Sequence, residues 1–303
     1  MLKEGAGDSR PTFFPSSFYF FMVAECVRKR KRKRMFFDLN VPAWSSEEEA
    51  QKFRNRALTF GWDCIASTTA YKRDTLKKAA AEGAPKSDLH YFVAGEGQGE
   101  ADAHCKAKQT TLLQISRIHL EASDIEENIN LISRCRKTYD LVSCQPVSEE
   151  SFRKICTIVD CDIISIDLSK ALPFRLQANH VQAALKRGLV FEISYSRLLQ
   201  DDDTIRRNFF SGAKFLCRCT RGKGIILSSG TNNLLDLRSP SDIINIGSLL
   251  DLKGALAKKA VEATCRSLID RVMRSKVFPK GFGLKEKGER PDGDEHLRKR
   301  QKC

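Results

Sequence analysis

The sequence predicts an α/β fold, a closed TIM-like (β/α) barrel of seven to eight parallel strands. Short apolar segments alternate about seven times with segments of helical periodicity over residues 35–275. Repeated strand-then-helix units require a parallel sheet, because each helix returns the chain to the same end of the sheet. Seven or eight such units in ~240 residues fit a closed barrel, and a doubly wound open sheet is the alternative.

The predicted strands are all short and apolar, and they comprise 36–41, 62–68, 111–118, 140–144, 162–168, 189–194 and 224–229. Serines that precede acidic residues or a proline mark helix starts between the strands. These predicted N-caps are Ser46, Ser123, Ser148 and Ser239. Gly188 is expected to end a helix immediately before a strand.

Residues 35–275 are expected to form one domain, since no linker rich in Gly, Ser and Pro divides them. The segment 84–108 predicts a long surface loop between the second and third strands. The flanking residues 1–34 and 276–303 are predicted to be disordered basic arms. The first holds nine Lys or Arg and three acidic residues and the second nine and five, so they carry +6 and +4 of the net charge of +14.

The N-terminal arm ends in a basic run of seven residues, Arg28, Lys29, Arg30, Lys31, Arg32, Lys33 and Arg34. This density of like charge is typical of nuclear import signals and of RNA-binding arms. A solvated tract that keeps the protein soluble is the alternative. The sequence 298–302 near the C-terminus is a second, weaker candidate for import.

Neither a membrane nor an oxidising compartment is expected. The apolar residues 13–23 are too few for a span of ~20 residues and include Pro15. The basic run follows them, whereas a signal peptide places its charge first. Eleven cysteines without a secretion signal favour reduced thiols in the cytosol or nucleus, and most, such as Cys64, Cys144 and Cys156, are expected in the core.

Barrel enzymes carry their catalytic residues at the C-terminal ends of the strands. The polar side chains at those ends are Asp38, Asn40, Arg117, His119, Asp167, Glu192, Ser194, Ser228 and Ser229. Asp38 and Asn40 share one face of their strand by two-residue alternation. Two acids and one histidine are compatible with a catalytic site. The alternative is that all these residues are hydrogen-bonded polar residues of the barrel or helix caps.

Motifs for metal or cofactor chemistry are scarce in this sequence. Only five histidines exist, and neither HxH nor HExxH occurs. The phosphate-binding patterns GxGxxG and GxxxxGK[ST] and the serine hydrolase pattern GxSxG are also missing. We therefore expect no metal, no cofactor and no catalytic residue.

The segment 201–221 predicts one long helix, with Asp201–Asp203 at its positive end. Ile205, Phe209 and Leu216 mark its apolar face. A basic stripe lies on or next to the opposite face, and we define it as Arg206, Arg207, Lys214, Arg218, Arg221 and Lys223. A stripe of one sign suits a phosphate backbone, because like charges at i,i+4 spacing repel. A solvated helix face is the alternative.

Seven segments cover essentially all of 35–275, in the order MFFDLNV, YDLVSCQP, IISIDLSKALPF, ALKRGLVFEISYS, RRNFFSGA, KGIILSSG and LRSPSDIINIGSLLDL. Through them the chain closely resembles the thirty-kilodalton, barrel-fold protein subunit of eukaryotic and archaeal ribonuclease P, which is shared with RNase MRP. The resemblance implies a barrel of the polymerase-and-histidinol-phosphatase type. In those phosphoesterases the first strand carries a His-x-His metal motif, where this sequence has Asp38-Leu39-Asn40.

The resemblance implies a non-catalytic, RNA-binding subunit in a particle whose RNA removes the 5′ leader from precursor tRNA. The implied partners are the ribonuclease P and MRP RNAs, precursor tRNA indirectly, and other protein subunits that include a small ferredoxin-like one. RNase MRP adds ribosomal RNA processing and a nuclear, nucleolar location. The alternative is a metal-dependent barrel phosphoesterase acting on phosphate esters or nucleic acid, with Asp38, His119, Asp167 and Glu192 as metal ligands.

Overall fold

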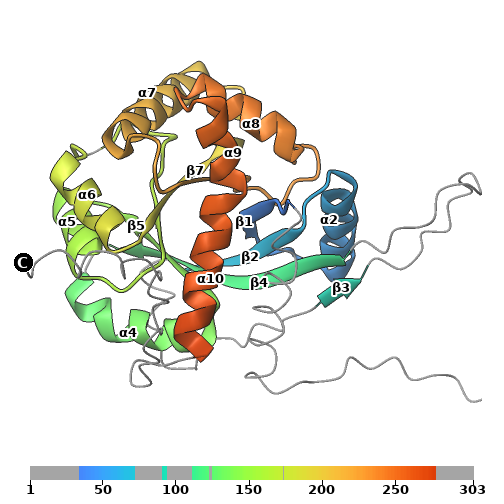
Figure 1. Ribbon diagram of the computed structural model, residues 1–303, viewed down its shortest axis with the longest axis horizontal. Helices are drawn as coiled ribbons and strands as arrows, with labels where there is room; N and C mark the ends of the chain where they lie inside the picture. The colour runs from blue at the N-terminus through green and yellow to red at the C-terminus, as the bar shows by residue number, and fades with distance from the viewer. Residues whose placement is uncertain (1–33, 72–90, 94–110, 123–124, 173, 278–303) are drawn as a thin grey trace, which may run out of the picture.

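The computed structural model describes residues 34–71, 91–93, 111–122, 125–172 and 174–277. Their strands form one eight-stranded sheet in the order β1-β2-β4-β5-β6-β7-β8, with β3 paired to β4 off this path. Every neighbouring pair along the path is parallel, and β3 is antiparallel to β4. The strands lie at the centre with helices around them (Figure 1), so the predicted barrel of parallel strands is confirmed.

The described strands are β1 (Phe37–Pro42), β2 (Cys64–Tyr71), β3 (Tyr91–Val93), β4 (Thr111–Ala122), β5 (Leu141–Pro146), β6 (Ile163–Ser165), β7 (Val190–Ser194) and β8 (Ile225–Ser228). The helices are α2 (Glu47–Thr59), α4 (Ile125–Thr138), α5 (Glu149–Thr157), α6 (Ala178–Lys186), the short 3-10 helix η2 (Tyr195–Leu199), α7 (Asp203–Thr220), α8 (Pro240–Leu249), α9 (Gly254–Val261) and α10 (Ala263–Val277). All seven predicted strands are present.

Two predicted boundaries need correction. The strand expected over 162–168 leaves the sheet after Ser165, and Asp167 instead accepts hydrogen bonds from the backbone and side chain of Ser169. A local turn of this kind satisfies the backbone where no neighbouring strand does. The surface loop expected over 84–108 contains β3, which pairs with the start of β4, and the rest of that segment lies outside the described residues.

The helix starts follow the predicted caps. Ser46, Ser148 and Ser239 each accept a hydrogen bond from a backbone N–H in the first turn of α2, α5 and α8. Ser123 lies outside the described residues. Gly188 follows α6 with φ +83°, a left-handed conformation that ends the helix at little cost for glycine.

Aspartates at the start of three strands tie each strand to the one before it. Each carboxylate accepts a backbone N–H of the preceding strand or of the residues leading into it. The donor–acceptor pairs are Phe36 to Asp63 (3.0 Å), Ser116 to Asp140 (2.8 Å) and Val142 to Asp162 (3.1 Å). The N-terminal ends of these neighbouring strands are therefore held in register by side chains as well as by the ladder.

Two buried apolar clusters account for the core. The outer cluster lies between the sheet and the surrounding helices and includes Phe53, Trp62, Phe152, Phe191 and Phe209. The inner cluster consists of inward-facing residues at the strand starts and of one face of α10. It includes Phe37, Leu113, Leu141, Ile163, Val190, Ile226, Leu268, Ile269 and Val272. The N-terminal half of the barrel interior is therefore apolar.

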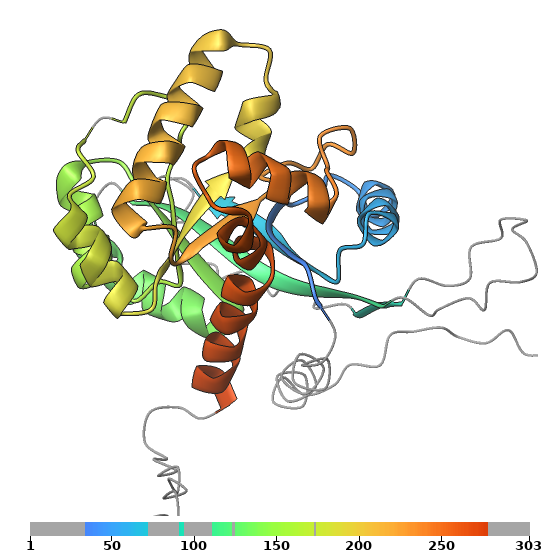
Figure 2. The same ribbon diagram turned by 45° about the horizontal axis from the view of Figure 1, so that its top comes forward.

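Helix α10 covers the N-terminal end of the barrel, and Figures 1 and 2 show it crossing the ring of strands. Besides its apolar face, two cations fix it. Lys276 donates a hydrogen bond to the carbonyl of Tyr139 and lies 3.5 Å from the carboxylate of Asp140. Arg271 donates to the carbonyl of Arg187 at 3.3 Å. The barrel interior is therefore closed at this end.

The cysteines and the hydropathy of the helices agree with these clusters. Seven of the eight cysteines in the described ranges are buried, including Cys64, Cys144 and Cys156, as the sequence predicts. No helix in the part of the chain that the structure describes is long and apolar enough to cross a membrane.

Candidate functional site

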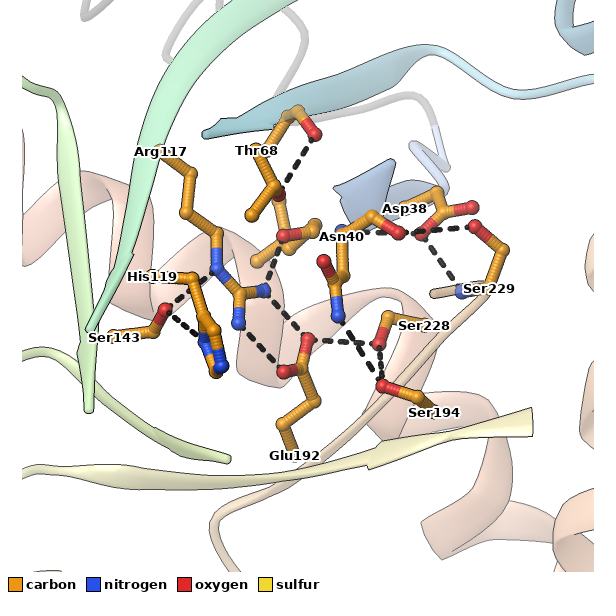
Figure 3. A network of polar contacts seen from close by, with 12 residues as sticks. Asp38, Asn40, Thr68, Arg117, His119, Ser143, Glu192, Ser194, Ser228 and Ser229 are labelled. Carbon is orange, nitrogen blue, oxygen red and sulfur yellow. Dashed lines mark hydrogen bonds and ion pairs between the residues drawn. The ribbon is translucent and has the colours of Figure 1, made fainter. Parts of the chain in front are cut away.

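Polar side chains fill the C-terminal half of the barrel interior, above the apolar inner cluster. They arise where the inward-facing positions of a strand change from apolar to polar, as from Ile115 to Arg117 in β4 and from Val190 to Glu192 in β7. We call this set the interior polar layer (Figure 3), and it comprises Asp38, Asn40, Thr68, Arg117, His119, Ser143, Glu192, Ser194, Ser228 and Ser229.

Arg117 lies at the centre of the interior polar layer. Its Nη1 and Nη2 atoms are 2.5 and 2.6 Å from the two carboxylate oxygens of Glu192, which makes a bidentate ion pair. Both side chains have an exposed fraction of 0%. Arg117 also donates through Nε to Ser143 Oγ at 3.0 Å and through Nη1 to the carbonyl of Leu39. The guanidinium thus joins β4 to β1, β5 and β7.

The ion pair keeps Glu192 charged inside the barrel. Burial alone would raise the pKa of Glu192, but the Arg117 guanidinium and hydrogen bonds from serine hydroxyls lower it below its usual value. Ser228 Oγ supplies one of these bonds, donating to Glu192 Oε1 at 2.8 Å. An unpaired buried carboxylate would cost several kcal/mol, so Glu192 depends on Arg117.

His119 is held as a neutral ring. Burial lowers the pKa of His119, and the nearby positive charge of Arg117 lowers it further. Its Nε2 lies 3.1 Å from Gln145 Oε1, which can only accept, so the ring proton is on Nε2. Its Nδ1 lies 3.1 Å from Ser143 Oγ, a hydroxyl whose one proton also faces the carbonyl of Ile118 at 3.0 Å. Both ring nitrogens are occupied by protein partners.

The barrel closes between β1 and β8 through a seam that uses side chains. These strands are the two ends of the hydrogen-bonded path, and no ladder pairs them. Instead, Asp38 Oδ1 accepts from the N–H of Ser229 at 3.0 Å, and the carbonyl of Asn40 accepts from the N–H of Gly230 at 2.8 Å. Ser229 Oγ also donates to that carbonyl at 3.1 Å. The carboxylate of Asp38 therefore accepts a backbone hydrogen bond that a carbonyl of a paired strand would otherwise accept.

The position of Asp38 strongly affects its protonation. Burial raises its pKa from 3.8 to about 6, against the lowering effect of its hydrogen bonds with Ser229 and Asn40. The negative charge of Glu192 raises it slightly further. The second carboxylate oxygen, Oδ2, is buried and has no hydrogen-bond partner among the described residues.

The predicted site residues thus fall into two groups. The structure brings Asp38, Asn40, His119 and Glu192 into the interior polar layer, where Asn40 Nδ2 donates to Ser194 Oγ at 3.2 Å. Asp167 is not part of it, because its carboxylate caps the turn at Ser169. Sequence reasoning left out Ser143 and Gln145, although alternating polar residues in an apolar strand were the available signal.

The interior polar layer is poorly suited to hold a metal ion. Both oxygens of Glu192 face Arg117, both nitrogens of His119 contact protein groups, and Asp167 lies elsewhere. Within the described ranges no group of three or more His, Cys, Asp and Glu side chains has the arrangement of a metal site. Chemically, the layer is a hydrogen-bonded network in which the guanidinium of Arg117 is the internal cation and balances the charge of Glu192.

Half of the basic stripe is paired with carboxylates. Arg206 forms ion pairs with Asp201 at 2.9 Å and Asp203 at 3.1 Å. Lys214 and Arg218 lie 3.9 and 3.4 Å from the carboxylate of Asp251, which follows α8. Asp201 and Asp203 belong to the start of the same helical segment, and only Asp251 comes from another part of the chain. The surface around the basic stripe therefore carries more negative charge than the sequence suggests.

The other half of the stripe is free of ion pairs to any described residue. Arg207, Arg221 and Lys223 are exposed. Arg221 is the C-cap of α7, with φ +55°, and Gly222 follows it in the same left-handed region. The predicted helix end before the last strand is thereby confirmed, while the RNA-binding role of the stripe stays a prediction.

Of the basic run at 28–34, only Arg34 lies within the described residues, where it is exposed and immediately precedes the buried Met35 and β1. The import role predicted for the run stays a prediction.

Comparison with known proteins places the chain in a family. The family model described as RNase P subunit p30 matches residues 35–276, which is the whole barrel including α10 except its last residue. The chain belongs to the RNase P subunit p30 family. The protein GAMETOPHYTE DEFECTIVE 1 of Arabidopsis thaliana is 38% identical over 163 residues, covering 54% of this chain and 28% of that protein. Probable ribonuclease P protein subunit 3 of Schizosaccharomyces pombe is 36% identical over 154 residues, covering 51% and 65%.

A solved structure agrees with the barrel fold of the family. A chain of archaeal ribonuclease P with mature tRNA, determined by cryo-EM, matches with a TM-score of 0.57 at 14% identity, covering 83% of this chain and 100% of the other. At that identity the likeness supports the fold alone. This member of the p30 family spans 28% and 65% of the lengths of the two relatives named above.

We predict that Arg117 and Glu192 stabilise the fold only together. Arg117→Met leaves an unpaired buried carboxylate and should lower the free energy of unfolding by about 3–5 kcal/mol. The double variant Arg117→Met, Glu192→Leu removes both charges and should recover most of that loss. Urea unfolding measures the free energy of unfolding of each variant. Arg206→Met, which removes the exposed ion pairs with Asp201 and Asp203, is a control with little expected effect. A double variant as unstable as the sum of its single variants would contradict the interpretation.

We also predict that Asp38 makes the free energy of unfolding depend on pH. Its folded pKa, about 6, lies above the unfolded value of 3.8, so the unfolded state loses its proton first as pH rises. Stability is therefore lost between about pH 4 and pH 6, by up to about 3 kcal/mol. Asp38→Asn keeps an acceptor for Ser229 and does not titrate. The unfolding free energy of Asp38→Asn minus that of the wild type should rise across this range, and a difference independent of pH would refute the assignment.

Proposed function

We propose that this chain is a non-catalytic, RNA-binding protein subunit of ribonuclease P that supports removal of the 5′ leader from precursor tRNA, and a subunit of RNase MRP in ribosomal RNA processing. Family membership over residues 35–276 supports this proposal, as does the fission yeast relative, which is named a probable ribonuclease P protein subunit. The partners are then the RNAs of both particles, precursor tRNA through that RNA, and other protein subunits, including a small ferredoxin-like one.

One observation carries the non-catalytic part of the proposal, and it is the buried ion pair between Arg117 and Glu192. In a parallel barrel the C-terminal half of the interior is where reacting groups gather. Here that space holds a guanidinium that occupies both oxygens of the nearest carboxylate, and the neutral His119 has both nitrogens engaged. No group in the pair is free to bind a metal or to exchange a proton with a substrate.

The first test recovers a tagged chain from nuclear and cytosolic fractions and sequences the RNA that accompanies it. We expect ribonuclease P and MRP RNAs to be enriched in the nuclear fraction. A variant that begins at Met35 lacks the basic run 28–34, so it should fold with the same thermal stability but enter the nucleus less. Recovery without either RNA would contradict the proposed function, whereas unchanged nuclear entry of the shortened chain would contradict only the import role of the run.

The second candidate, a metal-dependent phosphoesterase, is favoured by one observation, the unpartnered Oδ2 of the buried Asp38. A carboxylate oxygen is a suitable ligand for a divalent cation. We expect purified protein to carry far less than one Zn, Mn or Fe per chain and to leave precursor tRNA uncut in Mg²⁺ or Mn²⁺. Near-stoichiometric metal, with cleavage that disappears in Asp38→Asn, would establish the phosphoesterase instead.

A further inference from the structure

The two ends of the barrel differ in charge. Because the barrel strands are parallel, the helices between them all begin at the C-terminal end of the sheet and finish at the N-terminal end. The first turns of α2, α5, α7 and α8 are acidic, with Glu47, Glu48, Glu49, Glu149, Glu150, Asp203 and Asp242, whereas that of α6 holds no acid. Last turns are basic, with Arg56, Arg136, Lys137, Lys154, Lys186 and Arg218.

The helix dipole explains part of this distribution, since it favours anions at helix starts and cations at helix ends. It does not explain the cations of the N-terminal end that lie outside those last turns. Arg34, which precedes β1, and Lys223, in the turn between α7 and β8, are such cations, and Arg274 lies in the last turn of α10, the helix that covers the barrel. All three are exposed, and none forms an ion pair with a described residue.

Several acids near the N-terminal end do not neutralise these cations. Asp140 and Asp162 have exposed fractions of 2% and 1%, and their carboxylates are used by the backbone of the sheet. Lys276 and Arg136 lie 3.5 and 3.3 Å from them and so are internal counter-ions. Two exposed acids at this end, Asp160 and Asp251, pair with Arg136 and with Lys214 and Arg218. Lys186, Lys223 and Arg274 are exposed and have no ion-pair partner among the described residues.

These exposed cations lie on connected elements. The turn that carries Lys223 lies between α6 and α9, because a side chain at Gly222 would meet Leu256 of α9 and one at Gly224 would meet Leu185 of α6. Leu185 adjoins Lys186, the last residue of α6. Helix α10, which carries Arg274, is fixed to the end of α6 by Arg271 (Figure 1). Lys186, Lys223 and Arg274 therefore belong to one end of the molecule.

At the C-terminal end of the barrel, exposed carboxylates at the helix starts lie among the cations, of which Lys170, Arg175, Arg197 and Arg207 form no ion pair with a described residue. Arg206 is paired with Asp201 and Asp203, whose side chains have exposed fractions of 102% and 89%. Glu47 is 81% exposed. A polyanion that approaches this end meets exposed carboxylates, and one that approaches the other end meets exposed ammonium and guanidinium groups.

We propose that RNA binds at the N-terminal end of the barrel, the end covered by α10, with its phosphates near Lys186, Lys223 and Arg274. This placement rests on the proposed function, which supplies RNA as the polyanion. Contacts to phosphate need positive charge more than a shaped pocket, and a set of cations spread over helix ends, a turn and α10 meets that need. The basic stripe is then used at its C-terminal end, at Arg221 and Lys223, and not at Arg207.

The test compares two triple charge reversals of equal size. The first is Lys186→Glu, Lys223→Glu, Arg274→Glu at the N-terminal end. The matched control is Lys170→Glu, Arg175→Glu, Arg197→Glu, three exposed cations at the C-terminal end, two in the loop after β6 and one in η2 after β7. The probe is a transcribed ribonuclease P RNA, whose dissociation constant is measured by fluorescence anisotropy over a range of salt concentrations.

We expect the first variant to bind at least about tenfold more weakly, with a slope of log affinity against log salt lower by about two to three units. The control should keep the wild-type slope. Circular dichroism and thermal melting check the folds, and the corresponding Gln variants replace any Glu variant that fails to fold.

Three outcomes contradict the placement. RNA binding that is lost equally in both variants, or mainly in the control, would overturn it while leaving the proposed function in place. Unchanged RNA binding together with loss of a co-purifying protein would assign the N-terminal end to a protein partner. A wild-type chain that binds no RNA would remove the RNA-binding role and the placement with it.

Discussion

A positive charge with no access to water is the constraint on which the interior of this barrel depends. The guanidinium of Arg117 has five donors in a fixed plane, and each one left unsatisfied inside the barrel would cost free energy. Glu192 supplies two acceptors, Ser143 another and the carbonyl of Leu39 another. Because these partners come from separate strands, the cation selects one arrangement of the strands around it. A purely apolar interior would tolerate more alternatives.

The seam between β1 and β8 shows a related use of polar groups. A ladder between these strands would need several backbone hydrogen bonds, and the barrel closes with fewer by adding the carboxylate of Asp38 and the hydroxyl of Ser229. An ionised carboxylate is poorly solvated there, which accounts for its raised pKa of about 6. In the interior polar layer and at the seam, the acidic side chains of Glu192 and Asp38 thus hold strands together.

The sequence predicts the regular parts of this fold well, because repeated apolar strands and serine caps are local signals. The strand predicted at β6 is too long, because no local sequence signal shows that the carboxylate of Asp167 accepts a hydrogen bond from Ser169 in a turn. The sequence misses the position of α10 across the barrel end, because an amphipathic helix does not reveal which surface it covers. For the site, the sequence places Glu192 and His119 at the C-terminal ends of strands, and the structure has both in the interior polar layer. The pairing of Glu192 with Arg117 joins residues 75 positions apart, which no periodicity can show.

The aspartates at the strand starts have a consequence for how the chain finds its register. Each links a strand to its immediate predecessor over a short stretch of sequence, with separations of 27, 24 and 20 residues. Closing loops of this length costs less entropy than bringing the two ends of the sheet together. A slip by one residue would turn the apolar side chains of the strand to the wrong face and also break the carboxylate contact. The register of these strands is therefore set by contacts between strands that are neighbours in the sequence. The seam between β1 and β8 then joins strands whose register is already fixed.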